Sequence, residues 1–320
     1  MRRQQITEFM DKARDYLDAL IARIPHLSKL LIRREPPQAD ASPRPTRFRR
    51  LSDVGKQTPK GIAYHQRDDN SFSAPRLPID APVYAIGDIH GRADLLKALL
   101  EVVKTDCQNS TERPHLVFLG DYIDRGFQSY DVFETLIELG HDETYETVFL
   151  KGNHEQAMMR FLKDHSIGPD WAAFGGRETL ISYNISPPKA IGVVEEWIPI
   201  QAQLVRTIPQ EHVDFLEKLV LSHKIGPYGF VHAGVKPGVP YDQQSDEDRM
   251  WIRDEFLNAP DKEDLYIVHG HSPVNAPYWD HRRVNVDTGA YFTGRLTAVK
   301  ILKDNMSFLT NKVPSQEKKK

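Results

Sequence analysis

Six short apolar runs, each followed at once by a polar cluster that contains glycine, constrain the fold of this chain more than any other feature. Runs of this length and composition are typical of buried β-strands. Helical spacing of apolar residues at 95–103 and 132–137 separates the first three runs, and this alternation predicts βαβ units and an α/β fold. The six runs are VYAI (83–86), LVFL (116–119), TVFL (147–150), YGFV (228–231), LYIV (265–268) and RVNV (283–286).

The polar clusters all stand at the carboxyl ends of the predicted strands, where open α/β sheets bind their ligands. Together they supply two carboxylates, one amide oxygen and three imidazoles, a mixed set that suits Mn, Fe, Zn or Ni better than Mg or Ca. Six ligands exceed what one catalytic ion with open positions can use, so they predict two ions that share a carboxylate. The candidate metal ligands are Asp88, His90, Asp121, Asn153, His232 and His271.

The motifs GDIHG, GDYIDRG, GNHE, HAG and GHS follow one another in this order across residues 83–300. They resemble the motifs of the phosphoprotein phosphatase family of binuclear metallophosphoesterases. The resemblance implies a β-sandwich flanked by helices, and two divalent ions for which Mn²⁺ is the first expectation ahead of Fe, Zn and Ni. It places Asp88 and His90 on the first ion and Asn153, His232 and His271 on the second, with Asp121 as the bridge.

The same resemblance gives catalytic roles to charged residues beside these ligands. A hydroxide between two metal ions can attack phosphorus without a protein nucleophile. His154 would protonate the leaving oxygen, and Asp124 would orient its imidazole. Arg125 and Arg253 would hold the phosphate oxygens. Arg177 could reach the substrate or lie on a helix surface.

Four other residues near the motifs have supporting or structural expectations. Glu155 is expected to support the ligands or the start of a helix. Asp287 either supports the ligands or has no part in the site. The family pattern selects His271 rather than His269, although an exchange of these two stays open. Cys107 is expected to be a small packed side chain without a catalytic role.

These residues predict metal-dependent hydrolysis of phosphomonoesters, with a bacterial or phage-type serine/threonine protein phosphatase as the first reading. Its partner would be a phosphorylated protein or a small phosphomonoester, and no nucleic acid is expected. One alternative is a symmetrical dinucleoside tetraphosphatase, although residues 91–96 lack the Cys-Tyr that is common after the first motif there. Another is an inactive scaffold, and the complete ligand set argues against it.

The predicted domain plan has four parts. Residues 1–34 contain an amphipathic helix at 5–24, which could dock on the catalytic domain, a partner or a membrane surface. Residues 35–80 read as an extended linker rich in Pro and Arg. The catalytic domain is expected at 81–312 with a mainly helical cap at about 155–225, and a basic tail at 313–320.

Charge and cysteine content limit the compartment and the partners. Residues 1–60 carry a net charge of +7, so the other 260 residues carry −10. No apolar run approaches the ~20 residues of a membrane helix, and no secretory signal is evident. A single cysteine cannot form an internal disulfide or a thiolate zinc site. We therefore expect a cytoplasmic protein.

Overall fold

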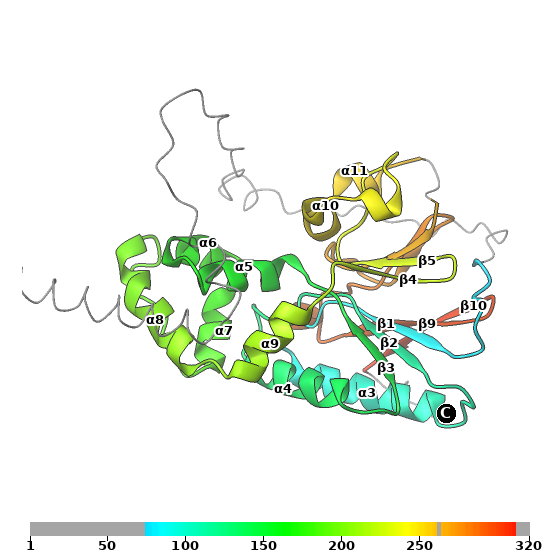
Figure 1. Ribbon diagram of the computed structural model, residues 1–320, viewed down its shortest axis with the longest axis horizontal. Coiled ribbons are helices and arrows are strands. Elements are labelled where there is room, and N and C mark those ends of the chain that lie inside the picture. Colours follow the sequence, from blue (N-terminus) through cyan, green and yellow to red (C-terminus); the bar gives the residue numbers. More distant parts are fainter. Residues whose placement is uncertain (1–73, 261–263, 312–320) are drawn as a thin grey trace, which may run out of the picture. The chain divides into compact units, whose positions relative to one another are not determined.

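The computed structural model describes residues 74–260 and 264–311, which all belong to one unit. Two five-stranded sheets form a sandwich, and helices cover its outer faces (Figure 1). This confirms the predicted α/β fold with a sandwich flanked by helices. The predicted N-terminal helix at 1–34, most of the linker and the basic tail lie outside the described residues.

The first sheet has the order β10-β9-β1-β2-β3. Strands β1, β2 and β3 are parallel to one another, whereas β9 and β10 are antiparallel to their neighbours. Helices α3 and α4 make the crossovers between the parallel strands, as the alternation of apolar patterns predicted. The bounds are β1 Val83–Ile86, α3 Ala93–Cys107, β2 His115–Phe118, α4 Ser129–Gly140, β3 Glu146–Phe149, β9 Thr297–Leu302 and β10 Asn305–Thr310.

The second sheet has the order β4-β5-β6-β8-β7, in which β5, β6 and β8 are parallel and the two edge strands are antiparallel. Short helices α10, α11 and α12 follow strands of this half of the chain. The bounds are β4 Ser222–Ile225, β5 Tyr228–Val231, α10 Asp246–Trp251, α11 Asp254–Leu257, β6 Tyr266–His269, β7 Tyr278–Trp279, β8 Arg283–Asn285 and α12 Ala290–Thr293.

Strand β1 shows why a run can be apolar at every position. Successive side chains on a strand point to opposite faces. Val83 and Ala85 belong to the core between the two sheets, whereas Tyr84 and Ile86 belong to the core between the first sheet and its helices. Both faces of the strand are buried, so no polar alternation is possible. The carboxyl ends of the parallel strands thereby stand at one edge of a dry sandwich.

The region predicted as a cap is helical for most of its length (Figure 1). Its helices pack around Phe161, Trp171 and Trp197, with the Phe161 ring centroid 4.8 Å from Trp171 and 5.5 Å from Trp197. The helix bounds are α5 Asn153–Phe161, α6 Gly168–Ala173, α7 Gly176–Ser182, α8 Trp197–Thr207 and α9 Gln210–Lys218.

Two predicted boundaries differ from the structure. Strand β4 occupies the last four residues of the predicted cap, because it pairs with β5 and completes the second sheet. The packed core also begins before residue 81. Leu77 is buried between the sheets and its N–H donates to the Lys303 carbonyl, while Tyr228 donates to the Pro75 carbonyl. The end of the predicted linker is therefore part of the sandwich.

No helix among residues 74–260 and 264–311 is long and apolar enough to cross a membrane.

Candidate metal centre and catalytic site

Tight turns after the strands hold the candidate residues in a backbone conformation that side-chain-bearing residues rarely adopt. Seven non-glycine residues in the described part of the chain have positive φ, and five of them are candidate site residues. These are His90, Asp121, Asp124, Arg125 and His271, with φ between 46° and 71°. Backbone strain of this kind costs about 1–3 kcal/mol per residue and persists only where the surroundings impose it.

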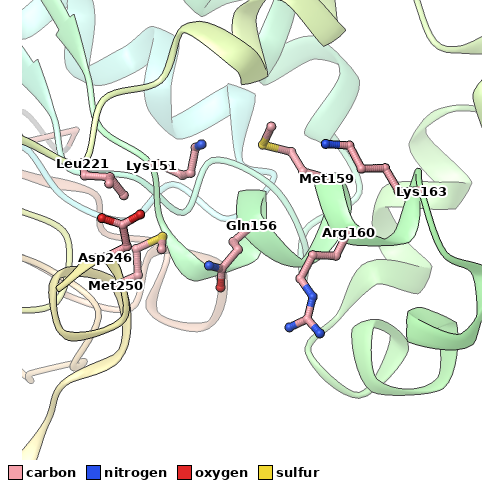
Figure 2. A pocket seen from close by; sticks show the side chains of 8 residues that line it. All are labelled: Lys151, Gln156, Met159, Arg160, Lys163, Leu221, Asp246 and Met250. Carbon is pink, nitrogen blue, oxygen red and sulfur yellow. The ribbon is translucent and has the colours of Figure 1, made fainter. Parts of the chain in front are cut away.

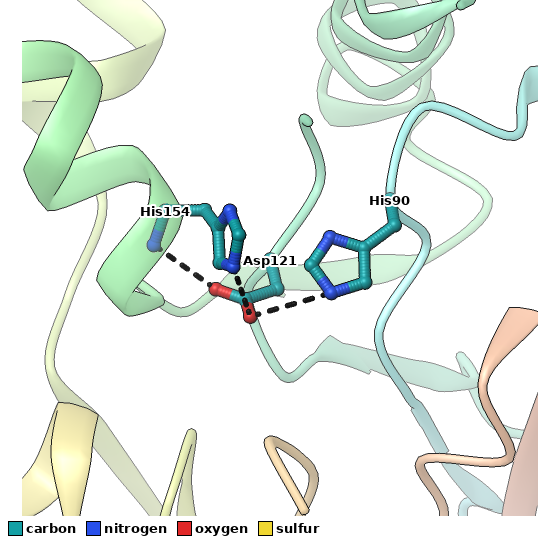
Figure 3. A group of neighbouring side chains, drawn as sticks. All are labelled: His90, Asp121 and His154. Carbon is teal, nitrogen blue, oxygen red and sulfur yellow. Dashed lines mark hydrogen bonds and ion pairs between the residues drawn. The ribbon is translucent and has the colours of Figure 1, made fainter. Parts of the chain in front are cut away.

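One group of side chains that could hold a metal ion consists of His90, Asp121 and His154 (Figure 3). His90 donates from Nδ1 to the Ile123 carbonyl at 2.9 Å, which leaves Nε2 facing Asp121 Oδ2 at 3.6 Å. His154 Nε2 lies 3.7 Å from the same oxygen. All three side chains are buried. Two imidazole nitrogens thus converge on one carboxylate oxygen.

A second group consists of Asp121, His232 and His271, so the two groups share Asp121. His232 donates from Nδ1 to the Leu119 carbonyl at 2.8 Å, which leaves Nε2 for a ligand. His232 Nε2 lies 3.3 Å from Asp121 Oδ1 and 3.2 Å from His271 Nδ1. Asn153 adds its side-chain oxygen 3.0 Å from the same nitrogen.

The chemistry of this donor set fits a cation. Asn153 Oδ1 and Asp121 Oδ1 carry only lone pairs, and both point at His232 Nε2 inside the protein. Burial lowers the pKa of His232, but the Asp121 carboxylate opposes it and the net result raises that pKa to about 9. The cluster therefore attracts positive charge strongly. Carboxylate, amide and imidazole ligands suit divalent transition metals.

Asp88 lies beside these groups. Its carboxylate accepts the His271 backbone N–H at 3.1 Å, and it is buried. Burial raises the pKa of Asp88 well above its usual value, and Asp287 adds to the effect. A cation beside this carboxylate would offset both causes. Asp287 itself accepts the Gly289 backbone N–H at 2.9 Å, so it braces the loop next to Asp88.

His154 and Asp124 form a buried pair, with His154 Nδ1 donating to Asp124 Oδ2 at 2.7 Å. Two side chains of the cap bind the same carboxylate: Trp171 Nε1 donates at 3.0 Å and the Thr179 hydroxyl at 2.6 Å. Thr179 Oγ1 also accepts the Asp124 N–H at 2.9 Å. The cap therefore fixes Asp124, and Asp124 fixes the imidazole of His154.

Thr179 was not among the predicted site residues. Its position in the stretch FGGRETL was visible in the sequence, but nothing there indicated which residue of that stretch reaches across to Asp124, 55 positions away. Only the packing of α7 against the loop after β2 brings the two together. The backbone before α7 also lies close to this loop, since a Cβ on Gly175 would lie 2.6 Å from the backbone nitrogen of Arg125.

Glu155 supports the ligand loops from behind. Its carboxylate accepts the backbone N–H groups of Asp121 at 2.9 Å, Tyr122 at 2.8 Å and Gly152 at 3.0 Å. Gly152 is needed here, because a Cβ would lie 2.1 Å from Asp121 Oδ1. Glu155 thus joins the loop after β2 to the start of α5, as its expected supporting role requires.

We predict that Glu155→Leu lowers the free energy of unfolding by at least about 3 kcal/mol, because it leaves buried N–H groups without acceptors. Glu155→Gln should cost less, since its amide oxygen still accepts. Urea denaturation followed by tryptophan fluorescence measures both, with the exposed Glu138→Leu as a matched control. Equal midpoints for Glu155→Leu and the control would contradict this role.

The three candidate arginines lie in different surroundings. Arg125 is half-buried, its Nη2 lies 3.4 Å from His154 Nε2, and its guanidinium stands 4.9 Å from the centre of the Tyr291 ring. Arg253 is exposed, and its Nη1 lies 3.5 Å from Ser272 Oγ, next to His271 in the chain. Arg177 is exposed on α7. Arg125 and Arg253 therefore remain the better placed for an anionic ligand.

His269 does not join either group of ligands. Its Nε2 accepts from Arg283 Nη1 at 2.9 Å, on strands β6 and β8 of the second sheet. His271, by contrast, stands beside His232 with ring centroids 4.9 Å apart. The geometry thus favours the predicted choice between the two histidines.

Aromatic side chains surround the site, which the sequence reasoning missed. Tyr291 packs edge-on to His90 at 5.6 Å between ring centroids, and its neighbour Phe292 is 60% exposed. Phe174 lies 5.9 Å from His154, and Trp251 lies 6.4 Å from His271. These rings offer flat apolar surfaces within reach of the metal ligands.

Comparison with known proteins places this arrangement in a family context. The family model described as calcineurin-like phosphoesterase matches residues 81–305. A bis(5'-nucleosyl)-tetraphosphatase PrpE, labelled asymmetrical, from Anoxybacillus flavithermus is 30% identical over 236 residues, which cover 67% of this chain and 88% of the relative. The protein of the same name from Halalkalibacterium halodurans is 29% identical over 228 residues, with the same coverage of both chains.

Two solved structures also align with this chain, at lower sequence identity. A putative diadenosine tetraphosphatase matches with a TM-score of 0.49 at 20% identity, covering 75% of this chain and 98% of that one. A protein serine/threonine phosphatase from Saccharomyces cerevisiae matches with a TM-score of 0.45 at 14% identity, covering 75% of this chain and 82% of that one.

Proposed function

The chain belongs to the calcineurin-like phosphoesterase family, and we propose that it is a metal-dependent phosphohydrolase that acts first of all on dinucleoside tetraphosphates. One observation carries the hydrolytic part: two groups of potential metal ligands share Asp121, and the His154–Asp124 pair stands at that carboxylate. A phosphoric ester or anhydride bound there would contact the metal ions, the proton donor and the cationic side chains at the same time.

In this proposal the ligand residues divide as the sequence suggested. Asp88 and His90 hold one divalent ion, Asn153, His232 and His271 hold the other, and Asp121 holds both. Two bound divalent ions supply an activated water and charge neutralisation at the phosphate.

The other residues act on the phosphate itself. Arg125 and Arg253 bind its oxygens, since planar guanidinium groups match them. Burial lowers the pKa of His154 to about 4, against the opposing effect of Asp121, so the free imidazole is neutral at pH 7. A bound phosphate dianion favours the protonated form. His154 can then give a proton from Nε2 to the leaving oxygen, while Nδ1 stays on Asp124.

The substrate class rests on the relatives' names and on the aromatic surroundings of the site. The relatives are named as asymmetrical tetraphosphatases, so an unequal cut is favoured over the symmetrical one that the sequence suggested as an alternative. Tyr291 and the exposed Phe292 could stack against a nucleobase. These two observations favour dinucleoside tetraphosphates over phosphoproteins as the substrate class.

Phosphoserine and phosphothreonine proteins, the first reading of the sequence, are the second candidate. The specific observation in their favour is the buried His154–Asp124 pair. An alkoxide leaves far less readily than a nucleotide phosphate, so a well-oriented general acid matters most for a serine or threonine ester.

A substrate panel separates the two. The enzyme reconstituted with Mn²⁺ is assayed on diadenosine tetraphosphate, a phosphoserine peptide and p-nitrophenyl phosphate, and the nucleotide products are separated by chromatography. We expect the highest kcat/KM on diadenosine tetraphosphate, with ATP and AMP as products. Two equivalents of ADP would indicate a symmetrical cut, and a clear preference for the peptide would reject the proposed substrate class.

A further inference from the structure

A groove of about 200 Å³ runs along α5, on the side that faces α10 (Figure 2). We call it the basic groove and define it by Lys151, Gln156, Met159, Arg160, Lys163 and Asp246. Leu221 and Met250 complete the lining, so three of its eight side chains are cationic and one is acidic. Figure 2 shows Lys151, Met159 and Lys163 in a row above Gln156 and Arg160, with Asp246 to the left of Gln156.

The basic groove begins next to the catalytic site. Helix α5 starts with Asn153 and His154, and positions 156, 159 and 160 recur at the spacing of one helix face. With a rise of 1.5 Å per residue, Arg160 stands ~9 Å along the axis from His154, and Lys163 follows the end of the helix at Phe161. Gln156 lies one turn after Asn153, so α5 carries both a residue of the second group of ligands and residues of the groove.

Gln156 connects the groove to the second group of ligands. Its side-chain oxygen accepts from Trp251 Nε1 at 2.9 Å, and the Trp251 ring stands against His271. Helices α5 and α10 form this wall of the groove, and the wall also supports His271 through Trp251.

Two of the three cationic side chains in the groove lack a counter-charge among the described residues. The side chains of Lys151 and Lys163 have neither a hydrogen bond nor an ion pair within residues 74–260 and 264–311. The single acid, Asp246, already lies 3.9 Å from Arg249. Two lysines without counter-charges in one concave surface favour an anionic ligand, and ammonium groups bind phosphate as point charges.

We propose that the basic groove binds the phosphates of the substrate that lie beyond the reacting one, in the nucleotide part that leaves. This deepens the proposed function and rests on it. The volume of about 200 Å³ is below the ~300–1,000 Å³ of sites that enclose a whole small ligand, so the groove holds a phosphate chain and leaves its nucleoside outside. The groove thereby selects substrates by the number of their phosphates.

The test compares the double variant Lys151→Gln/Lys163→Gln with wild type and with Lys97→Gln, an exposed lysine on α3 that serves as a matched control. The substrates are diadenosine tetraphosphate and p-nitrophenyl phosphate at saturating Mn²⁺. We expect KM for the tetraphosphate to rise about 10-fold, with less than about a 2-fold change on p-nitrophenyl phosphate. The difference should shrink as salt rises from about 0.05 to 0.5 M. Lys97→Gln should match wild type on both substrates.

Unchanged KM for the tetraphosphate, or equal losses on both substrates, would overturn the assignment of the groove. Inhibition of p-nitrophenyl phosphate hydrolysis by ATP and by AMP, at fixed free Mn²⁺, tests the groove separately from the proposed function. If wild type does not cleave the tetraphosphate, the proposed function fails. The groove still stands if ATP inhibits wild type more tightly than AMP and the double variant loses this difference.

Discussion

Asp121→Asn is expected to lose both metal ions and to lower kcat/KM by on the order of 10⁴-fold, the scale seen when one member of a catalytic unit is removed. Asp121 belongs to both groups of potential ligands, so neutralising it weakens two sites at once. It is also the charge that raises the pKa of His232, and without it the cluster attracts positive charge less. Metal content by elemental analysis and the rate on p-nitrophenyl phosphate check the two parts together.

Asparagine is a suitable replacement because the fold should tolerate it. Asp121 has a φ of 53°, a region in which Asn is favoured among non-glycine residues. The Asn side-chain oxygen can still accept the His154 backbone N–H, which Asp121 Oδ1 accepts at 3.2 Å. Asp94→Asn, at an exposed position on α3, provides the control. A variant that retained two equivalents of metal would show that Asp121 is not the bridge.

His154→Asn is expected to lower kcat by about 10²–10³-fold on an alkyl phosphate and much less on p-nitrophenyl phosphate, because only the alkoxide depends on a proton from the enzyme. Metal content should stay at the wild-type level. This last point matters because His154 Nε2 lies as close to Asp121 as His90 Nε2 does, at 3.7 Å against 3.6 Å. Geometry alone therefore also permits His154 to be a metal ligand instead of the general acid.

The two measurements distinguish these roles. Loss of metal in His154→Asn would make His154 a ligand, and equal rate losses for both leaving groups would exclude a general acid. Thr179→Val should reproduce a weaker form of the same leaving-group dependence, since it removes a 2.6 Å hydrogen bond that holds Asp124. The exposed His141→Asn, at the end of α4, is the matched control for a histidine replacement.

Most strands that carry the site were predictable because both of their faces are buried, although the edge strand β3 is partly exposed. Each of the six apolar runs lies within one residue of an observed strand. Strands β9 and β10 were not predicted. They read TAVKIL and NMSFLT, with polar residues among the apolar ones. Strand β9 is largely buried between β1 and β10, whereas β10 forms the edge of the sheet and is partly exposed. A short run with one solvated face is difficult to tell from a loop by composition alone.

The substrate was less predictable from the sequence than the type of reaction. Asp121, Asn153, His154 and the other motif residues follow strands directly, so their convergence is implied by the strand order. Residues that select a substrate come from elements with no such pattern. Tyr291 lies on a four-residue helix, and Lys151 and Lys163 are ordinary surface lysines until α5 and α10 form a groove around them.

The sequence by itself indicated the α/β strands and the set of candidate ligands, because a turn after a buried strand fixes where the next few side chains stand. Its resemblance to a known family implied the sandwich and the pairing of His154 with Asp124. Tertiary structure alone decided that Thr179 and Trp171 of the cap hold Asp124, and that residues from 75 onward join the core. These contacts join segments tens of residues apart. Their partners are chosen by how whole helices and sheets pack, and no short stretch of sequence records that packing.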